Sequence, residues 1–477
     1  MERLERLTAR LVVTNPCLLT ATELRGLVAR REMSCREVLE AHLARIEAVD
    51  PLLNAIVTRT DDLARQRADD LDRNPDGHGP LTGLPIAHKD LLPTKGIRTT
   101  YGSPLYAEHV PEVDALIVER MRAAGAVVVG KTNAPEFGAG SQTFNRVFGA
   151  TRNPYDTTKT CGGSSGGAAV ALAARMIPIA DGSDTGGSLR NPAAFCNVIG
   201  FRPSPGRVPS FPGDPWSDLS TAGPMARTVD DVALLFSVLA GPDSRVPNCL
   251  PEPGSAFRSV APIDLSKLRI AVTEDFGSLP VQSPIREAIR ELGDTLAAAG
   301  ATMIEAAPDL ADARRIFHIL RATGFRRRFS PLSNSEKAQL KDTIRWNLDA
   351  GLELTLADYD WVYAARAALV ARVAEFFGDV DLLLGPTTQV LPFDVTTDWV
   401  REVDGERMAT YIEWMESCSW ITVTCCPALS LPAGFKNGLP VGAQLIAPLR
   451  EDAFLLRAAK AVEAVTGYAS REPVFAD

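Results

Sequence analysis

Cys161-Gly-Gly-Ser-Ser-Gly-Gly167 and Asp184-Thr-Gly-Gly-Ser-Leu-Arg190 are the two runs that decide the fold of this chain. Between them, the apolar residues 168–176 predict a buried helix and residues 176–180 predict a buried strand. The glycines therefore stand at the ends of regular elements. For this reason we reject the alternative that the Gly-, Ser-, Thr- and Pro-rich region 150–225 is a flexible linker.

Short apolar runs separated by helical patterns continue on both sides of this stretch. Predicted strands are 84–87, 126–129, 268–272, 381–385, 428–431 and 443–446, and predicted helices are 228–240, 284–299 and 451–466. Such alternation indicates an α/β fold with a central mixed β-sheet covered by helices on both faces. We expect residues 1–477 to form one large domain.

Three regions can be distinguished within this domain. Residues 1–75 are predicted to be N-terminal helices, because Thr20-x-x-Glu23 and Ser34-x-x-Glu37 are capping boxes. Residues 80–240 contain the glycine-rich runs and form the predicted core of the site. Residues 310–377 are predicted to be a helical excursion over the sheet.

Composition limits the classes of function. Of the 477 residues, 45% are hydrophobic and 23% are charged, which allows a large core, and the net charge of -9 argues against nucleic acid as a ligand. The apolar stretch 168–180 is interrupted by Arg175 and Pro178 and is shorter than the roughly 20 residues that span a bilayer. Residues 1–19 contain no sustained apolar segment. We expect a cytoplasmic protein that does not associate with membranes.

The eight cysteines show no Cys-x-x-Cys spacing, and the five histidines do not cluster with them. This pattern argues against a zinc site and against a disulfide scaffold. We expect reduced thiols, and a metal only through ligands that are distant in the sequence.

Two further motifs resemble known sites but lack the required context. Residues 125–132 satisfy the phosphate-loop pattern, yet residues 126–129 are apolar and suit a buried strand, and Pro135 follows where a helix would have to begin. Residues 162–166 match the Gly-x-Ser-x-Gly elbow of α/β-hydrolases, but His318 is the only histidine downstream. If a serine is the nucleophile, a group other than histidine must accept its proton.

Lys89 is the candidate for that group. It ends the run Gly83-Leu-Pro-Ile-Ala-His-Lys89-Asp90, which predicts a buried strand with the lysine at its end. Burial removes the hydration of an ammonium group and lowers its pKa, so that a neutral amine can act as a base. Lys89, Ser164 and Ser188 together then form a candidate catalytic set without histidine.

With these motifs, the chain resembles the amidase signature family, whose hydrolases use a Ser-Ser-Lys triad on one large α/β fold. The resemblance rests on the Lys89-Asp90 pair, the Gly-Gly-Ser-Ser-Gly-Gly run, and Asp-Thr-Gly-Gly-Ser-x-Arg, with 24 positions between Ser164 and Ser188. It extends over roughly residues 35–465 and also includes Gly438-Leu-Pro-Val-Gly442.

The resemblance implies a role for each matching residue. Ser188 would be the nucleophile, Ser164 the bridging serine after a cis peptide bond from Gly163, and Lys89 the base. The oxyanion hole would consist of backbone amides, those of Thr185, Gly186, Gly187 and Ser188. Supporting residues around the triad would be Asp90, Ser165, Asp184 and Arg190.

Two residues near these motifs differ from the usual family pattern. His88 stands where the family usually has a small or aliphatic residue, and we expect it to pack beside the site. Cys161 precedes the glycine run without a charge that would stabilise a thiolate, which argues against a nucleophilic role.

The resemblance implies hydrolysis of the C–N bond of a small or medium carboxylic acid amide, with esters and carbamates also open, and without a cofactor. The alternative is the glutaminase A subunit of a tRNA-dependent amidotransferase, which needs partner chains. Two features favour a free-standing amidase: His88 in the lysine motif, and Ser220-Thr-Ala-Gly-Pro-Met225 where the subunits usually read closer to Ser-Leu-Asp-Gln-x-Gly-Pro. A non-catalytic binding protein is a third class, against which the intact triad argues. Family analogy favours a homodimer.

The acyl pocket is expected to involve the 310–377 block, because the family varies its substrate range there. This block offers six aromatic side chains as candidate walls, those of Phe325, Phe329, Trp346, Tyr359, Trp361 and Tyr363. Aromatic residues at helical spacing also serve as core, so only some of them are expected near the site.

Overall fold

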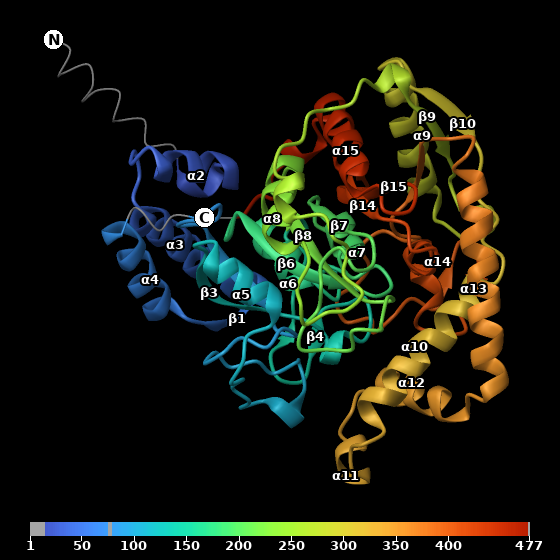
Figure 1. Cartoon of the computed structure of the whole chain (residues 1–477), viewed down its shortest axis with the longest axis horizontal. Helices are drawn as coiled ribbons and strands as arrows, with labels where there is room; N and C mark the ends of the chain where they lie inside the picture. Colours follow the sequence, from blue (N-terminus) through green and yellow to red (C-terminus); the bar gives the residue numbers. More distant parts are fainter. Residues whose placement is uncertain (1–14, 75–78, 476–477) are drawn as a thin grey trace.

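The computed structural model of the chain describes residues 15–74 and 79–475. Strands run from the middle of the molecule to its upper right edge, where β9 and β10 lie, helices α2 to α4 lie on one side, and helices α10 to α13 lie on the opposite side (Figure 1). This arrangement confirms the predicted α/β class.

The central sheet has eight strands in the order β10-β9-β11-β15-β14-β7-β8-β6. Their bounds are β10 (Thr302–Glu305), β9 (Arg269–Val272), β11 (Leu382–Pro386), β15 (Leu439–Ile446), β14 (Ala428–Lys436), β7 (Ile199–Arg202), β8 (Thr221–Ala226) and β6 (Ile179–Asp184). Strand β9 pairs in parallel with β10 and β11, and the other pairs are antiparallel. The predicted mixed sheet is confirmed.

A smaller sheet of three strands, in the order β1-β3-β2, lies beside the end strand β6 of the large sheet. Its strands are β1 (Ile56–Arg59), β3 (Val127–Thr132) and β2 (Pro85–Lys89). The Asp181 carboxylate of β6 accepts a hydrogen bond from the backbone N–H of Lys89 at 3.0 Å. Where the two sheets meet, the Asp181 carboxylate therefore accepts the hydrogen bond that a backbone carbonyl would accept inside a continuous sheet. Short ribbons are formed by β4 (Phe144–Asn145) with β5 (Gly149–Ala150), and by β12 (Glu402–Val403) with β13 (Glu406–Arg407).

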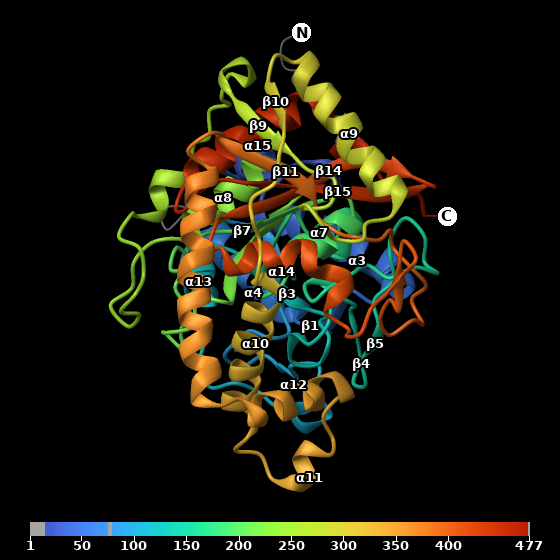
Figure 2. The same ribbon diagram turned by 90° about the vertical axis from the view of Figure 1, so that its right-hand side faces the viewer.

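Helices cover both faces of the large sheet, as predicted. On one face lie α8 (Val229–Leu239), α9 (Ser283–Ala298) and α15 (Asp452–Thr466). On the other lie α6 (Gly166–Ala173), α7 (Arg190–Phe195) and α14 (Glu416–Val423), of which α7 and α14 can be seen in Figure 2. Helix α6 begins with Gly166 and Gly167, the last two residues of the first glycine run, and all of its residues are buried. Region 150–225 is therefore structured around a buried helix.

The N-terminal region contains α2 (Ala21–Ala29), α3 (Cys35–Leu53) and α4 (Asp61–Arg73), followed further along by α5 (Leu116–Ala123). Both predicted capping boxes are present, at Thr20 and at Ser34. Residues 1–14 and 75 of the predicted helical region lie outside the described residues.

The predicted helical excursion consists of α10 (Ala313–Phe329), α11 (Asn334–Lys337), α12 (Asp342–Glu353) and α13 (Leu356–Phe376). It leaves the sheet after β10 and returns at β11. Figure 2 shows α10, α13 and α14 in front of the strands, and α10 contacts α14. The block therefore covers the side of the sheet on which α7 and α14 lie.

Strands β7 and β8 are absent from the strands that the sequence predicts, because glycine and proline weaken their pattern. A Cβ placed on Gly223 of β8 would lie 2.2 Å from the carbonyl oxygen of Phe201 in β7. The close packing of these strands requires a glycine, and glycine is depleted in strands. The phosphate-loop motif, in contrast, contributes residues 127–132 to β3, as its apolar residues indicate.

Other predictions from composition can be compared with the described part of the chain. All eight cysteines are free. Among residues 15–74 and 79–475, no group of three or more His, Cys, Asp or Glu side chains could hold a metal ion. No helix in the same ranges is long and apolar enough to cross a membrane.

Candidate active site

Lys89 is the last residue of β2, and its side chain is fully buried. Its Nζ lies 2.8 Å from Ser164 Oγ, 2.9 Å from Ser165 Oγ and 3.1 Å from Ser183 Oγ. No carboxylate of the described residues forms an ion pair with Lys89. The amine is thus surrounded by hydroxyl groups, which can donate to it or accept from it.

Burial lowers the pKa of Lys89 to about 7. The carboxylates of Asp184 and Asp181 act in the opposite direction, because each stabilises the ammonium form. Burial prevails because no countercharge is in direct contact with Nζ. A substantial fraction of Lys89 is therefore neutral near pH 7 and has a lone pair for an incoming proton.

Ser164 follows a cis peptide bond from Gly163 and is buried. The neighbouring loop holds this turn through two hydroxyl groups. Ser141 Oγ donates to the carbonyl oxygen of Gly163 at 2.7 Å, and Thr143 Oγ1 donates to that of Gly162 at 2.9 Å. Asn191 Nδ2 in turn donates to Ser141 Oγ at 2.7 Å. The orientation of Ser164 thus depends on residues from three segments.

Ser188 lies in the loop between β6 and α7 and is half-buried. Its carbonyl oxygen accepts the N–H of Ser165 at 3.1 Å, which joins the two glycine-rich loops directly. The structure therefore places the loop of Ser188 directly beside the Lys89–Ser164 pair, although 75 positions separate Lys89 from Ser164 and 24 separate Ser164 from Ser188.

One of the four amides predicted for the oxyanion hole is occupied. Gly187 donates its N–H to Asp184 Oδ1 at 2.8 Å, so this amide is not free to bind a substrate oxygen. The amides of Thr185, Gly186 and Ser188 have no acceptor among the described residues. The four-amide oxyanion hole stays a prediction, and in this structure the carboxylate that shapes the loop accepts the hydrogen bond of the Gly187 amide.

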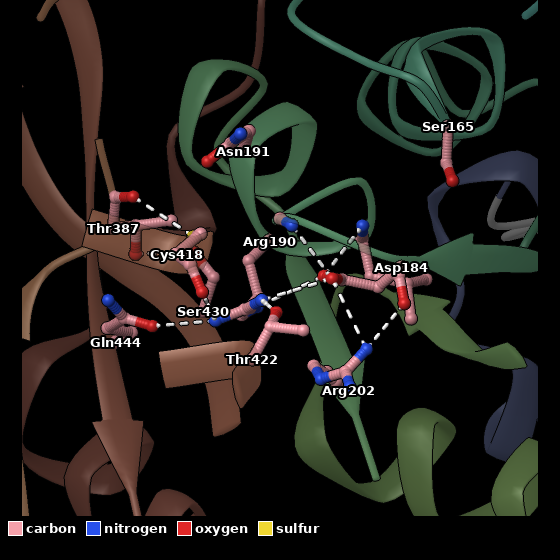
Figure 3. A network of polar contacts seen from close by, with 12 residues as sticks. Ser165, Asp184, Arg190, Asn191, Arg202, Thr387, Cys418, Thr422, Ser430 and Gln444 are labelled. Atoms are coloured by element: carbon pink, nitrogen blue, oxygen red, sulfur yellow. Dashed lines mark hydrogen bonds and ion pairs between the residues drawn. The ribbon is translucent and has the colours of Figure 1, made fainter. Parts of the chain in front are cut away.

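Asp184 and Arg190 form the centre of a buried ionic network (Figure 3). Arg190 donates to both oxygens of Asp184 at 3.0 Å, and Arg202 lies 3.6 Å from the same carboxylate. Arg190 also donates to Thr422 Oγ1 and Gln444 Oε1. Although burial raises the pKa of Asp184, the two guanidinium groups hold it well below the usual range. The network ties the Ser188 loop to α14 and β15.

The other predicted supporting residues occupy different positions. Ser165 contacts Lys89 directly and lies apart from the ionic network in Figure 3. Asp90 accepts hydrogen bonds from the N–H of Thr100 at 3.1 Å and from its hydroxyl at 2.5 Å. It therefore fixes the loop after β2 rather than touching the amine. Cys161 is buried, and burial raises the pKa of its thiol to about 12.

Asp181 is absent from the residues that the sequence predicts for the site, yet it joins the two sheets there. Its carboxylate accepts the Lys89 N–H and lies 2.6 Å from Nδ1 of the buried His88. The sequence does contain a signal for Asp181, because its carboxylate interrupts the apolar run 176–182, and a charged residue in a buried strand requires a specific partner. His88 thus packs beside the site, as expected, and is paired as well.

Helix α10 and the loop after β3 form the wall above the two serines. A Cβ placed on Gly186 would lie 2.7 Å from Phe317 Cζ, and one placed on Gly138 would lie 3.4 Å from Ser164 Oγ. Phe137, next to Gly138, packs against Phe329 with ring centroids 4.9 Å apart. The two ends of α10 therefore contact the two sides of the candidate site.

Comparison with known proteins agrees with this geometry. The profile of the family described as Amidase matches residues 37–456. The chain belongs to the amidase family. As a member of this family it is an enzyme that acts on C–N bonds, and the resemblance of its motifs is confirmed.

Curated relatives in the amidase family include the A subunits of glutamyl-tRNA(Gln) amidotransferase from two bacteria. The one from Thermus thermophilus is 39% identical over 477 residues, covering 94% of this chain and 98% of the relative. That from Methylococcus capsulatus is 35% identical over 482 residues, covering 95% and 98%.

Solved structures of the amidase family superpose over nearly the whole chain. A bacterial aryl acylamidase has a TM-score of 0.87 at 29% identity, covering 95% of this chain and 97% of that one. The glutamyl-tRNA(Gln) amidotransferase A subunit of Thermotoga maritima has a TM-score of 0.77 at 26% identity, covering 94% and 95%. Both likenesses support the same α/β fold.

Proposed function

We propose that this enzyme hydrolyses a carboxylic acid amide through an acyl-enzyme on Ser188, with Lys89 as the base and Ser164 as the relay between them. The observation that carries the proposal is the buried amine of Lys89, with Nζ 2.8 Å from Ser164 Oγ and a pKa lowered to about 7 by burial. A lysine without a contacting countercharge is expensive to bury, and activation of a neighbouring hydroxyl explains its position.

In the acylation step, neutral Lys89 accepts a proton from Ser164, and Ser164 accepts one from Ser188. The Ser188 oxygen then forms a bond to the substrate carbonyl carbon, whose oxygen becomes negatively charged. The free amides of Thr185, Gly186 and Ser188 are the donors available to this oxyanion. As the C–N bond breaks, the proton returns through Ser164 to the leaving nitrogen, which departs as ammonia or an amine.

In the deacylation step, a water molecule attacks the acyl-enzyme. One proton of this water passes through Ser164 to Lys89, and the water oxygen forms a bond to the acyl carbon. The bond to the Ser188 oxygen then breaks, Ser188 regains a proton through the same relay, and a carboxylic acid leaves. Asp184 supports both steps, because its bonds to the N–H groups of Gly187 and Leu189 hold the loop that carries Ser188.

The test measures ammonia or amine release from aliphatic, aryl, peptide, ester and carbamate substrates. We expect Ser188→Ala and Lys89→Ala to abolish turnover, and intact-mass measurement of the wild type with a slow ester to show one acyl adduct. Unchanged hydrolysis by Ser188→Ala, or an adduct that persists in this variant, would refute the assignment.

Two settings for this reaction are supported by different observations. The curated relatives, one of them 39% identical over almost the full chain, favour an amidotransferase A subunit that hydrolyses glutamine. The higher structural similarity to the aryl acylamidase, together with His88 and the Ser220–Met225 motif, supports a free-standing amidase. We further propose that the excursion 310–377 is the substrate-side region of the single domain in either setting.

One experiment distinguishes the two settings. The purified chain is assayed with glutamine and with simple amides, alone and together with the other amidotransferase subunits and tRNA, and its oligomeric state is measured by light scattering. Turnover of simple amides by the chain alone, as monomer or homodimer, supports the free-standing amidase. Ammonia release that requires glutamine and the partner subunits supports the amidotransferase setting.

A further inference from the structure

Arg321 on α10 is a buried cation without a countercharge. Its residue is 6% exposed, and no carboxylate of the described residues lies within 4 Å of its guanidinium group. A buried charge normally has an ionic partner, because removal from water without one costs several kcal/mol. The aromatic rings of Phe317, Phe325 and Tyr411 lie 4.8–5.9 Å from its Cζ and offset part of this cost.

Arg321 belongs to the helix that contacts the loops of the candidate site, α10. It lies one helical turn after Phe317, which contacts Gly186 of the Ser188 loop, and two turns before Phe329, which packs on Phe137 beside Gly138. One turn of helix corresponds to about 5.4 Å. Along α10, residue 321 therefore stands between Phe317 and Phe329, the two residues through which the helix contacts the loops of the site.

Several donors converge on a single oxygen beside Arg321, that of the Tyr411 hydroxyl group. Arg321 Nε and Nη2 donate to Tyr411 Oη at 3.1 and 2.8 Å, and Asn347 Nδ2 donates to the same oxygen at 2.6 Å. Asn347 Nδ2 also donates to the Thr343 carbonyl, which fixes the orientation of the amide. The hydroxyl hydrogen of Tyr411 and the Nη1 group of Arg321 have no acceptor among the described residues.

These donors match one kind of ligand group. A carboxylate accepts hydrogen bonds at both oxygens and neutralises a guanidinium, which binds it in a planar and often bidentate manner. A neutral alkyl or aryl group would leave the cation unpaired. The net charge of -9 provides no general attraction for anions, so recognition would have to come from this local cluster.

We propose that Arg321 and Tyr411 bind a carboxylate of the substrate, so that the preferred substrates are monoamides of dicarboxylic acids and related amides with a carboxylate about one helical turn from the scissile carbonyl. This inference rests on the proposed amide hydrolysis and names its substrate class. Glutamine belongs to this class, so both settings of the proposed function are compatible with it.

The kinetic test compares glutaramate with valeramide, which has a similar chain length but no carboxylate. We expect Arg321→Met to lower kcat/KM for glutaramate about 100-fold and that for valeramide less than about 3-fold, because only the first loses a charge partner. Tyr411→Phe keeps the ring and should lower kcat/KM for glutaramate about 10-fold. Arg326→Met, at an exposed position of the same helix, is the matched control. Equal losses for both substrates would overturn the proposal.

A binding test separates this proposal from the proposed function. Glutarate is titrated calorimetrically into Ser188→Ala protein with and without Tyr411→Phe or Arg321→Lys. Weaker glutarate binding in the double variants supports the subsite even if no amide is hydrolysed, in which case only the proposed function fails. Hydrolysis of valeramide as fast as glutaramate, together with glutarate binding that does not depend on Arg321 or Tyr411, overturns the subsite and leaves the proposed function in place.

Discussion

Lys89 Nζ and Ser164 Oγ lie 2.8 Å apart where the small sheet meets the large one, and their residues are 0% and 2% exposed. Lys89 is the end of β2, whereas Ser164 precedes α6, so the contact joins two separate elements. The site is therefore a property of how the two sheets pack.

The pH dependence of kcat/KM should follow the deprotonation of Lys89, whose pKa burial lowers to about 7. The neutral amine is the base, so kcat/KM should rise with pH up to about 7 and then level off. The measurement is kcat/KM for a neutral amide from pH 5 to 9. An acid limb near pH 4 would point to a carboxylate instead.

Lys89→Met should be more stable than the wild type at pH 6, and this advantage should shrink by pH 10. The folded-state pKa of Lys89 is about 7 and the ordinary pKa of a lysine is 10.5, so the unfolded chain binds more protons between these values. Wild-type stability therefore gains from rising pH across this window, by about 1.4 kcal/mol per pH unit at most. Urea unfolding of both proteins at pH 6, 8 and 10 tests this, and a difference that does not vary with pH would contradict it.

Gly186→Ala should reduce activity at least about 10-fold, because the new Cβ would lie 2.7 Å from Phe317 Cζ and displace the loop that donates to the oxyanion. Phe317→Leu removes the clashing atom. The double variant should therefore recover part of the lost kcat. Kinetics of the two single variants and the double variant give the coupling, and strictly additive losses would exclude a steric cause.

Ser141 is predicted to be a positioning residue for Ser164, because its hydroxyl holds the Gly163 carbonyl and accepts from Asn191. Ser141→Ala should lower kcat about 10-fold or more while changing KM little, with a loss of stability of about 1 kcal/mol. Ser217→Ala, at an exposed position, is the control. If Ser141→Ala lowers stability without a fall in kcat, its role is structural only.

Asp184→Asn should destabilise the fold by about 3–5 kcal/mol, because it leaves the buried Arg190 and Arg202 without their carboxylate. Chemical unfolding measures this directly. Asp349→Asn, at an exposed position, should change stability by less than about 0.5 kcal/mol. Similar effects of the two substitutions would show that the network contributes little.

The sequence predicts several strands and helices correctly, because the hydrophobic and capping patterns of these segments match the way they are buried in the fold. The apolar run 126–129 supplies the first half of β3, and the capping boxes at Thr20 and Ser34 start α2 and α3. Strands β7 and β8 escape prediction because glycines such as Gly223, required by close strand packing, remove the propensity on which the prediction depends.

The sequence by itself determined the fold class, the amidase family and the identity of the candidate residues Lys89, Ser164 and Ser188, because local hydrophobic patterns and motif spacing are properties of short segments. Only the tertiary structure decided which partners those residues have. Asp181 accepts the N–H of Lys89 across 92 positions of the chain, and Arg321 donates to Tyr411 across 90 positions. Contacts of this kind follow from packing, which no local pattern encodes.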